Sequence, residues 1–145
     1  MLCECAAFYK RQGLTLKDVL DRIFEKYGYF IESLFSISLA DAAGSARIAE
    51  IMQTLRDHPP QALANIRVSA MEDYETGIRT AGGQTSLLTL PKSDVLKFIL
   101  EDGSWAAVRP SGTEPKCKFY FCSQGGNMAE SASRLKEMMD YFKQF

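Results

Sequence analysis

The chain has 145 residues, of which 46% are hydrophobic and 24% charged, a composition that excludes wholesale disorder and collagen-like repetition. Seventeen basic and eighteen acidic residues leave a formal charge of −1, which disfavours the broad basic surface typical of nucleic-acid-binding proteins. The length suits one domain, or one domain with a piece of another. With no run of about 18 apolar residues and no signal-peptide pattern at the first residues, we expect a cytoplasmic protein without a membrane span.

The cysteines and the single histidine offer little catalytic chemistry. Neither the pair Cys3 and Cys5 nor the pair Cys117 and Cys122 has the C-x-x-C spacing of zinc ribbons and redox sites. A four-thiolate metal site is the less favoured alternative, and we expect reduced thiols that are mostly buried as small hydrophobic residues. His58 stands beside two prolines, so we interpret it as a loop residue rather than a catalytic base.

The first 27 residues predict a pair of short helices. Apolar residues at helical spacing favour a helix over residues 1–12 that ends at Gly13. Thr15 is placed to cap a second helix, with Asp18 three residues further on, and Gly28 ends that segment. A helix that begins at the first residue without a capping side chain suggests a chain cut inside a larger structure. Two short helices bury little surface by themselves.

The middle of the chain predicts a strand, a helix and a further strand. Residues 29–39 read as a strand, residues 41–44 as a break, and residues 45–55 as a helix with one apolar face. The alternation over residues 66–70 indicates a half-buried strand. Residues 72–86 are acidic and then rich in glycine and threonine, which predicts a loop.

Short strands and one helix are expected in the last third of the chain. The strands are expected at residues 87–90, 95–100, 105–109 and 116–122. A turn signal from Glu101 to Ser104 predicts that the second and third of them form a hairpin. Asn127 is placed to cap a final helix whose apolar face holds Leu135, Met138, Met139 and Phe142. Grouped strands with flanking helices indicate an α+β fold, an antiparallel sheet with helices packed on one face.

One loop carries recognisable chemistry, the run from Arg109 through Pro-Ser-Gly-Thr-Glu-Pro-Lys-Cys to Lys118. The Arg109 guanidinium matches two oxygens of a phosphate, and the hydroxyls of Ser111 and Thr113 are further donors. Gly112 lets the backbone approach an anion closely and aim successive N–H groups at it, while the prolines lower the entropy lost on ordering. These residues suit a phosphate site, although a hairpin loop rich in ordinary turn formers has a similar composition.

Strand alternation after the loop separates two sets of side chains. Cys117, Phe119 and Phe121 are expected to face the core. The intervening residues Lys116, Lys118 and Tyr120 are expected to face the site or the solvent.

The sequence from Arg109 to Lys116, followed by Lys118-Phe-Tyr120, resembles the signature of the C-terminal domain of the α-D-phosphohexomutases, the phosphoglucomutase/phosphomannomutase family. The likeness continues, in order, at residues 15–29, 51–60, 90–98 and 102–105. It therefore covers nearly the whole chain.

This resemblance implies a four-domain enzyme that moves phosphate between the 1- and 6-positions of a hexose through a bisphosphorylated intermediate. The family carries a phosphoserine in its first domain, a Mg²⁺ site of aspartates in its second and a sugar-recognition loop in its third. The fourth domain, with a fold like the TATA-binding protein, binds a substrate phosphate and helps to close the cleft. Arg109, Ser111, Gly112 and Thr113 match the phosphate contacts of the family, and Lys118 is a weaker candidate.

The chain lacks any segment like the phosphoserine, metal or sugar loops of the family. We therefore expect residues 1–28 to be the tail of a third domain and residues 29–145 to be the C-terminal phosphate-binding domain. The expected partners are hexose phosphates and the remaining domains of a parent enzyme, without nucleic acid or membrane. By itself this part would have no catalytic residue, metal or cofactor and no mutase activity, and the choice between glucose and mannose would lie elsewhere.

Two other interpretations stay open at this point. The chain is alternatively a stand-alone phosphosugar-binding module without catalysis. A nucleic-acid-binding domain is suggested only by the fold that the resemblance implies, and the charge of −1 argues against it.

Overall fold

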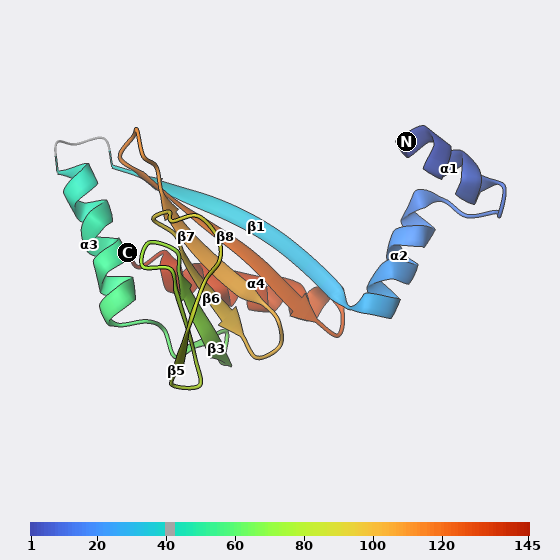
Figure 1. The fold of residues 1–145 in the computed structure, drawn as a ribbon. Helices are drawn as coiled ribbons and strands as arrows, with labels where there is room; N and C mark the ends of the chain where they lie inside the picture. The colour runs from blue at the N-terminus through green and yellow to red at the C-terminus, as the bar shows by residue number, and fades with distance from the viewer. Residues whose placement is uncertain (40–42) are drawn as a thin grey trace.

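The computed structural model describes residues 1–39 and 43–145, and Figure 1 shows the arrangement of their helices and strands. In chain order the elements are α1 (Leu2–Lys10), α2 (Leu16–Tyr27), β1 (Tyr29–Ser38), α3 (Gly44–Asp57), β2 (Ala62–Leu63), β3 (Ile66–Asp73), β4 (Ile78–Ala81), β5 (Gln84–Leu87), β6 (Leu96–Leu100), β7 (Trp105–Pro110), β8 (Lys116–Gly125) and α4 (Met128–Phe142). No helix in this part of the chain has both the length and the apolar character needed to cross a membrane.

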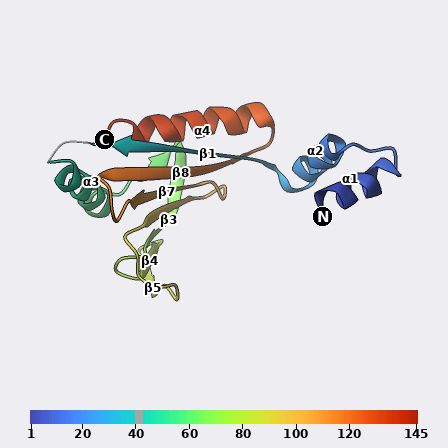
Figure 2. The same cartoon turned by 90° about the horizontal axis from the view of Figure 1, so that it is seen from above.

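The strands form one sheet in the order β1-β8-β7-β6-β3-β4-β5, and β2 pairs with β3 at its side. Neighbouring strands in the described residues are antiparallel throughout. Helix α4 lies along one side of this sheet, while α1 and α2 extend beyond the beginning of β1 (Figure 2). The expected α+β architecture, with a helix pair before the sheet, is confirmed.

A single hydrophobic core lies between one face of the sheet and the helices α3 and α4. The alternation of each strand sends its large apolar side chains to this face, as for Phe98, Val108 and Phe119, which are fully buried. Leu55 of α3 and Phe142 of α4 are fully buried in the same cluster. Both helices therefore cover the same face of the sheet, and the opposite face is open, with polar residues beside exposed apolar ones such as Leu34.

The expected helix caps are present. Thr15 Oγ1 accepts a hydrogen bond from the Asp18 backbone N–H at 3.2 Å, and the Asp18 carboxylate accepts from the Thr15 N–H at 2.7 Å, a reciprocal capping box. Asn127 Oδ1 accepts from the Glu130 N–H at 2.9 Å. The hairpin of β6 and β7 around residues 101–104 also forms as expected.

Two predictions in the middle of the chain are wrong. The loop expected over residues 72–86 contains the end of β3 and the hairpin of β4 and β5. That hairpin packs little apolar surface, so it lacks the alternation that reveals a strand. Its turn is Gly82-Gly83, with φ of +56° and +78°, the positive values that tight hairpins require. Of the strand expected at 87–90, only Leu87 is in β5. The expected break at 41–44 lies partly outside the described residues.

Two of the four cysteines are exposed and two are buried, whereas the sequence led us to expect most of them to be buried. Cys3 and Cys5 are exposed on α1, and Cys117 and Cys122 are buried in β8. Burial raises the pKa of the Cys117 thiol to about 12. Burial, with the negative charge of Glu32 as a second cause, also raises the pKa of Cys122. Both buried thiols are therefore protonated and unreactive near neutral pH.

We expect Ellman's reagent at pH 8 to label Cys3 and Cys5 rapidly in the folded protein, because both are exposed. Cys117 and Cys122 should react only after denaturation, because burial keeps their thiols protonated and only the thiolate reacts. Rapid absorbance change equivalent to four thiols in the native protein would contradict the burial of β8.

Candidate functional site

The loop that was singled out in the sequence is held by the sheet at both ends. It occupies residues 111–115, between the antiparallel strands β7 and β8. The Ser111 N–H donates to the Lys116 carbonyl at 2.8 Å and closes the base of the loop. The Pro115 carbonyl accepts from the Leu39 N–H at 3.0 Å, which also ties the loop to the chain that follows β1. The loop is therefore anchored by three segments of backbone.

Arg109 and Lys118 lie directly opposite each other across β7 and β8. Both are exposed on the face of the sheet away from the core, and Ser36 of β1 lies on the other side of Lys118. Within the described residues neither cation takes part in an ion pair. Like charges opposite each other on a sheet repel, so an anion bound between them relieves an unfavourable contact.

The next part of the loop adds polar groups to this cationic pair. Gly112 and Thr113 are exposed, and Ser111 is half-buried, with its Oγ 3.5 Å from the Thr113 backbone N. Gly112 does not have a positive φ, and a Cβ there would meet no atom within 4 Å. Its backbone therefore does not use the left-handed region that favours glycine. The open space over it still permits a ligand to approach the backbone closely.

Two carboxylates beside the loop, those of Glu114 and Asp94, are each paired with a cation. Lys116 Nζ lies 2.6 Å from the Glu114 carboxylate, and its hydrogen bond, together with its charge, lowers the pKa of that group. Arg56, near the end of α3, pairs with Asp94. Lys116 is therefore engaged by Glu114, whereas Arg109 and Lys118 form no ion pair among the described residues.

A depression of about 160 Å³ separates the loop from helix α3. Its lining consists of Ser45, Ile48, Ala49, Asp94, Pro110, Ser111, Glu114 and Pro115. The loop is thus backed by the first turns of α3, about sixty residues earlier in the chain. Neither this helix nor Ser36 was among the expected site residues, because only the folded sheet brings them to the loop.

Arg56 links three separate parts of the structure. Its guanidinium pairs with Asp73 of β3 at 3.3 Å, with Glu75 at 2.6 Å and with Asp94, which lines the depression beside the loop. Its side chain is only 16% exposed, so these contacts are partly shielded from solvent. The network therefore ties the end of α3 to β3 and to Asp94.

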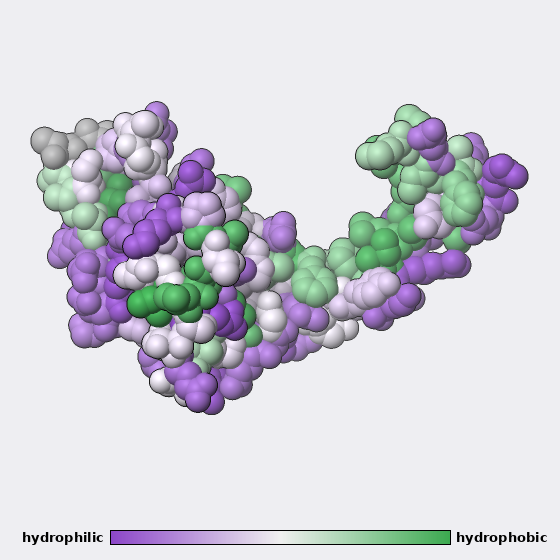
Figure 3. Space-filling view, in the orientation of Figure 1, coloured by the Kyte–Doolittle hydropathy of each residue, from purple (hydrophilic) through white to green (hydrophobic). Residues whose placement is uncertain are grey.

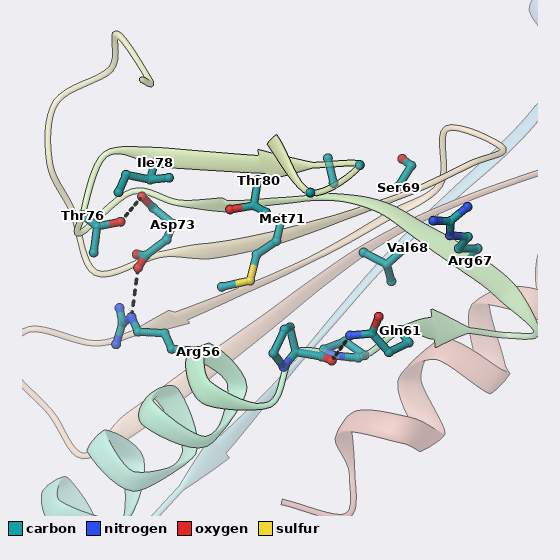
Figure 4. A pocket seen from close by; sticks show the side chains of 15 residues that line it. Arg56, Gln61, Arg67, Val68, Ser69, Met71, Asp73, Thr76, Ile78 and Thr80 are labelled. Carbon is teal, nitrogen blue, oxygen red and sulfur yellow. Dashed lines mark hydrogen bonds and ion pairs between the residues drawn. The ribbon is translucent and has the colours of Figure 1, made fainter. Parts of the chain in front are cut away.

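A larger depression of about 440 Å³ lies between the β3–β4 hairpin and the segment after α3. Figure 4 shows Met71 and Thr80 on one wall, Gln61 on the other, and the pair of Arg56 and Asp73 at one end. None of the five expected site residues lines it. The candidate site is therefore the loop and the open sheet face beside it, not the larger depression.

The Mg²⁺ implied by the resemblance finds no ligand set here. In residues 1–39 and 43–145, no group of three or more histidine, cysteine, aspartate or glutamate side chains is arranged to hold a metal ion.

Comparison with known proteins identifies relatives that match most of the chain. The family model described as phosphoglucomutase/phosphomannomutase, C-terminal domain, matches residues 42–140. A phosphoglucomutase of Staphylococcus aureus is 35% identical over 141 residues, which are 96% of this chain and 25% of that protein. A phosphoglucomutase of Staphylococcus epidermidis is 39% identical over 122 residues, 83% of this chain and 22% of that protein.

The chain therefore spans about a quarter of the length of the curated relatives that it matches. Among solved structures, the open form of pp63/parafusin, an exocytosis-sensitive phosphoprotein and phosphoglucomutase from Paramecium, has a similar fold. The TM-score is 0.59 at 17% identity, over 94% of this chain and 24% of the other.

We expect Arg56→Leu to lower the free energy of unfolding by about 1–3 kcal/mol, because it leaves the buried Asp73 carboxylate without its cation. Urea denaturation measures this difference. The control is Arg67→Leu, whose pair with Glu101 is exposed and should contribute less than about 1 kcal/mol. Equal effects of the two substitutions would contradict a structural role for the Arg56 network.

Proposed function

The chain belongs to the phosphoglucomutase/phosphomannomutase family, and from this premise we propose that it is the C-terminal phosphate-binding part of a phosphohexomutase. The loop between β7 and β8 would bind the non-reacting phosphate of a hexose phosphate. The observation that carries the proposal is the cross-strand pair of Arg109 and Lys118 beside a loop rich in donors. The parent enzyme would interconvert hexose 1-phosphate and hexose 6-phosphate.

Each residue of the site has a distinct part in this proposal. The planar guanidinium of Arg109 donates two parallel hydrogen bonds to phosphate oxygens, and Lys118 adds a second positive charge. The hydroxyls of Ser111 and Thr113 donate further hydrogen bonds. The exposed backbone at Gly112 leaves room for the phosphate to contact main-chain N–H groups.

This binding would contribute to catalysis at a distance. A phosphate held away from the reacting bond supplies binding energy that orients the sugar and favours closure of the cleft. No residue of this loop would touch the reacting atoms. The phosphoserine and Mg²⁺ of the family, and the choice of sugar, would come from parts of the parent enzyme that this chain does not contain.

We further propose that residues 1–28 are the tail of a preceding domain and that residues 29–145 form the phosphate-binding domain. Figure 3 shows hydrophobic residues gathered over α1 and α2. Leu20 and Ile23 are each 47% exposed, and Tyr27 is 60% exposed. An apolar helix face that stays open to water supports packing against another part of a longer protein. The exposed, unpaired thiols of α1 suit a reducing cytoplasmic location.

We expect inorganic phosphate and glucose 1,6-bisphosphate to shift the amide NMR signals of Ser111, Gly112 and Thr113 saturably, whereas glucose shifts none of them. A single site of this kind should bind in the millimolar range, on the order of 4 kcal/mol. Arg109→Ala should weaken binding by about tenfold or more, since it removes charged hydrogen bonds.

The matched control in this titration is Arg67→Ala, which removes an exposed arginine from β3 and leaves the loop intact. It should bind phosphate as the unaltered chain does. Equal loss of affinity in both variants would indicate a general effect of net charge and would contradict a specific site at the loop.

We expect the purified chain to form no glucose 6-phosphate from glucose 1-phosphate, even with Mg²⁺ and glucose 1,6-bisphosphate present. The physical reason is that this chain would bind a phosphate without supplying the group that transfers it. A coupled assay with the Staphylococcus aureus phosphoglucomutase as positive control measures this. Turnover above the blank by the chain alone would contradict the proposal that this chain binds phosphate while other parts of a parent enzyme transfer it.

A further inference from the structure

Strand β1 forms one edge of the sheet and is unusually long for that position. It runs for ten residues, from Tyr29 to Ser38, and pairs only with β8 among the described residues. The opposite edge is β5, which has four residues. A long edge strand offers a row of backbone N–H and C=O groups to another strand.

The register identifies which backbone groups of β1 point outward. The Leu39 N–H donates to the Pro115 carbonyl, and this pair continues the register of β1 with β8. Hydrogen-bonded pairs alternate along antiparallel strands, so every second residue from Ile37 back to Tyr29 bonds β8. The outward groups belong to Phe30, Glu32, Leu34, Ser36 and Ser38. In the described part of the chain these groups form no backbone hydrogen bond outside the sheet.

This edge lacks the usual features that prevent pairing. It contains no proline and no lysine, its register with β8 has no bulge, and its only charged residue is Glu32. On the open face of the sheet it carries Phe30, which is 42% exposed, and Leu34, which is 60% exposed. The edge therefore offers both hydrogen bonds and apolar surface.

We propose that two copies of this chain associate through antiparallel pairing of their β1 strands, with a two-fold axis at Leu34, to form one continuous sheet. The inference is independent of the proposed function. An axis perpendicular to the sheet requires residues of the same face to meet. Centred on Leu34, it pairs Glu32 with Ser36 and Phe30 with Ser38 of the other copy.

The chemistry of this register is self-complementary. Leu34 meets Leu34 on the open face, and Ile31 meets Ile37 on the core face, so apolar side chains meet across the interface. Each outward residue from Phe30 to Ser38 finds a partner whose N–H and C=O also point outward. An axis at Glu32 would instead place two carboxylates opposite each other, which is unfavourable.

A second copy of this chain is the partner that pairs best with the β1 edge. It brings the same unpaired edge, so one closed interface satisfies both strands and leaves no further edge of this kind. A strand from another protein would need to match the apolar and small polar residues without placing an acidic residue opposite Glu32. The identical strand meets that condition in the register centred on Leu34.

The first experiment is sedimentation equilibrium of the full chain over a concentration series that extends to the millimolar range. The mean mass should rise from 16.2 kDa towards twice that value. Leu34→Pro removes an outward N–H without removing a bond to β8, and should keep the mass at the monomer value. A mass that stays at the monomer value for the unaltered chain at the highest concentration would overturn the proposal.

The matched control is Thr85→Pro on the opposite edge. The Leu88 N–H donates to the Gly77 carbonyl in register with β4 and β5, so the Thr85 N–H points outward there in the same way. This variant should associate as the unaltered chain does. If Leu34→Pro disturbs the circular dichroism spectrum, Leu34→Lys replaces it, because it keeps the strand and places two like charges at the axis. That variant should weaken association at least about tenfold.

A crosslinking experiment tests the register. In a background with Cys3→Ser and Cys5→Ser, Leu34→Cys should form a covalent dimer with a short bis-maleimide, because the two side chains meet at the axis. Glu32→Cys, exposed on the same face, should not. Stronger crosslinking through position 32 would overturn this register. A dimer that survives Leu34→Pro but is lost in Ile23→Asp would assign the interface to the α2 face and overturn the edge pairing.

Discussion

The register of β8 against β7 is the constraint on which both the core and the candidate site depend. Side chains alternate along β8, so the register that buries Phe119 opposite Val108 also places Lys118 opposite Arg109 on the other face. A slip of one residue in either strand would bring a cation into the core. The hydrophobic packing that stabilises the sheet therefore also holds two like charges close together on its open face.

The residues around Arg109 and Lys118 determine how exposed and how strongly charged this part of the sheet is. Lys116 pairs with Glu114 and Arg56 pairs with Asp94, whereas Arg109 and Lys118 form no ion pair within the described residues. Helix α3 backs the loop and the chain after β1 bonds to it.

Local signals predicted most of the elements because their causes are local. The capping box of Thr15 and Asp18, the cap at Asn127 and the turn before β7 are each complete within a few residues. The hairpin of β4 and β5 was missed because neither strand has a consistently buried face. Its Gly82-Gly83 turn was a usable signal for that hairpin.

The sequence by itself determined the family likeness, the α+β class and the residues of the loop, because a short motif and side-chain periodicity are properties of neighbouring residues. Only the tertiary structure decided that Arg109 faces Lys118, that Arg56 reaches Asp94, and that β1 becomes an edge strand. These are relations between segments far apart in the chain. The order and register of the strands set them, through the requirement that one face of every strand reach the same core.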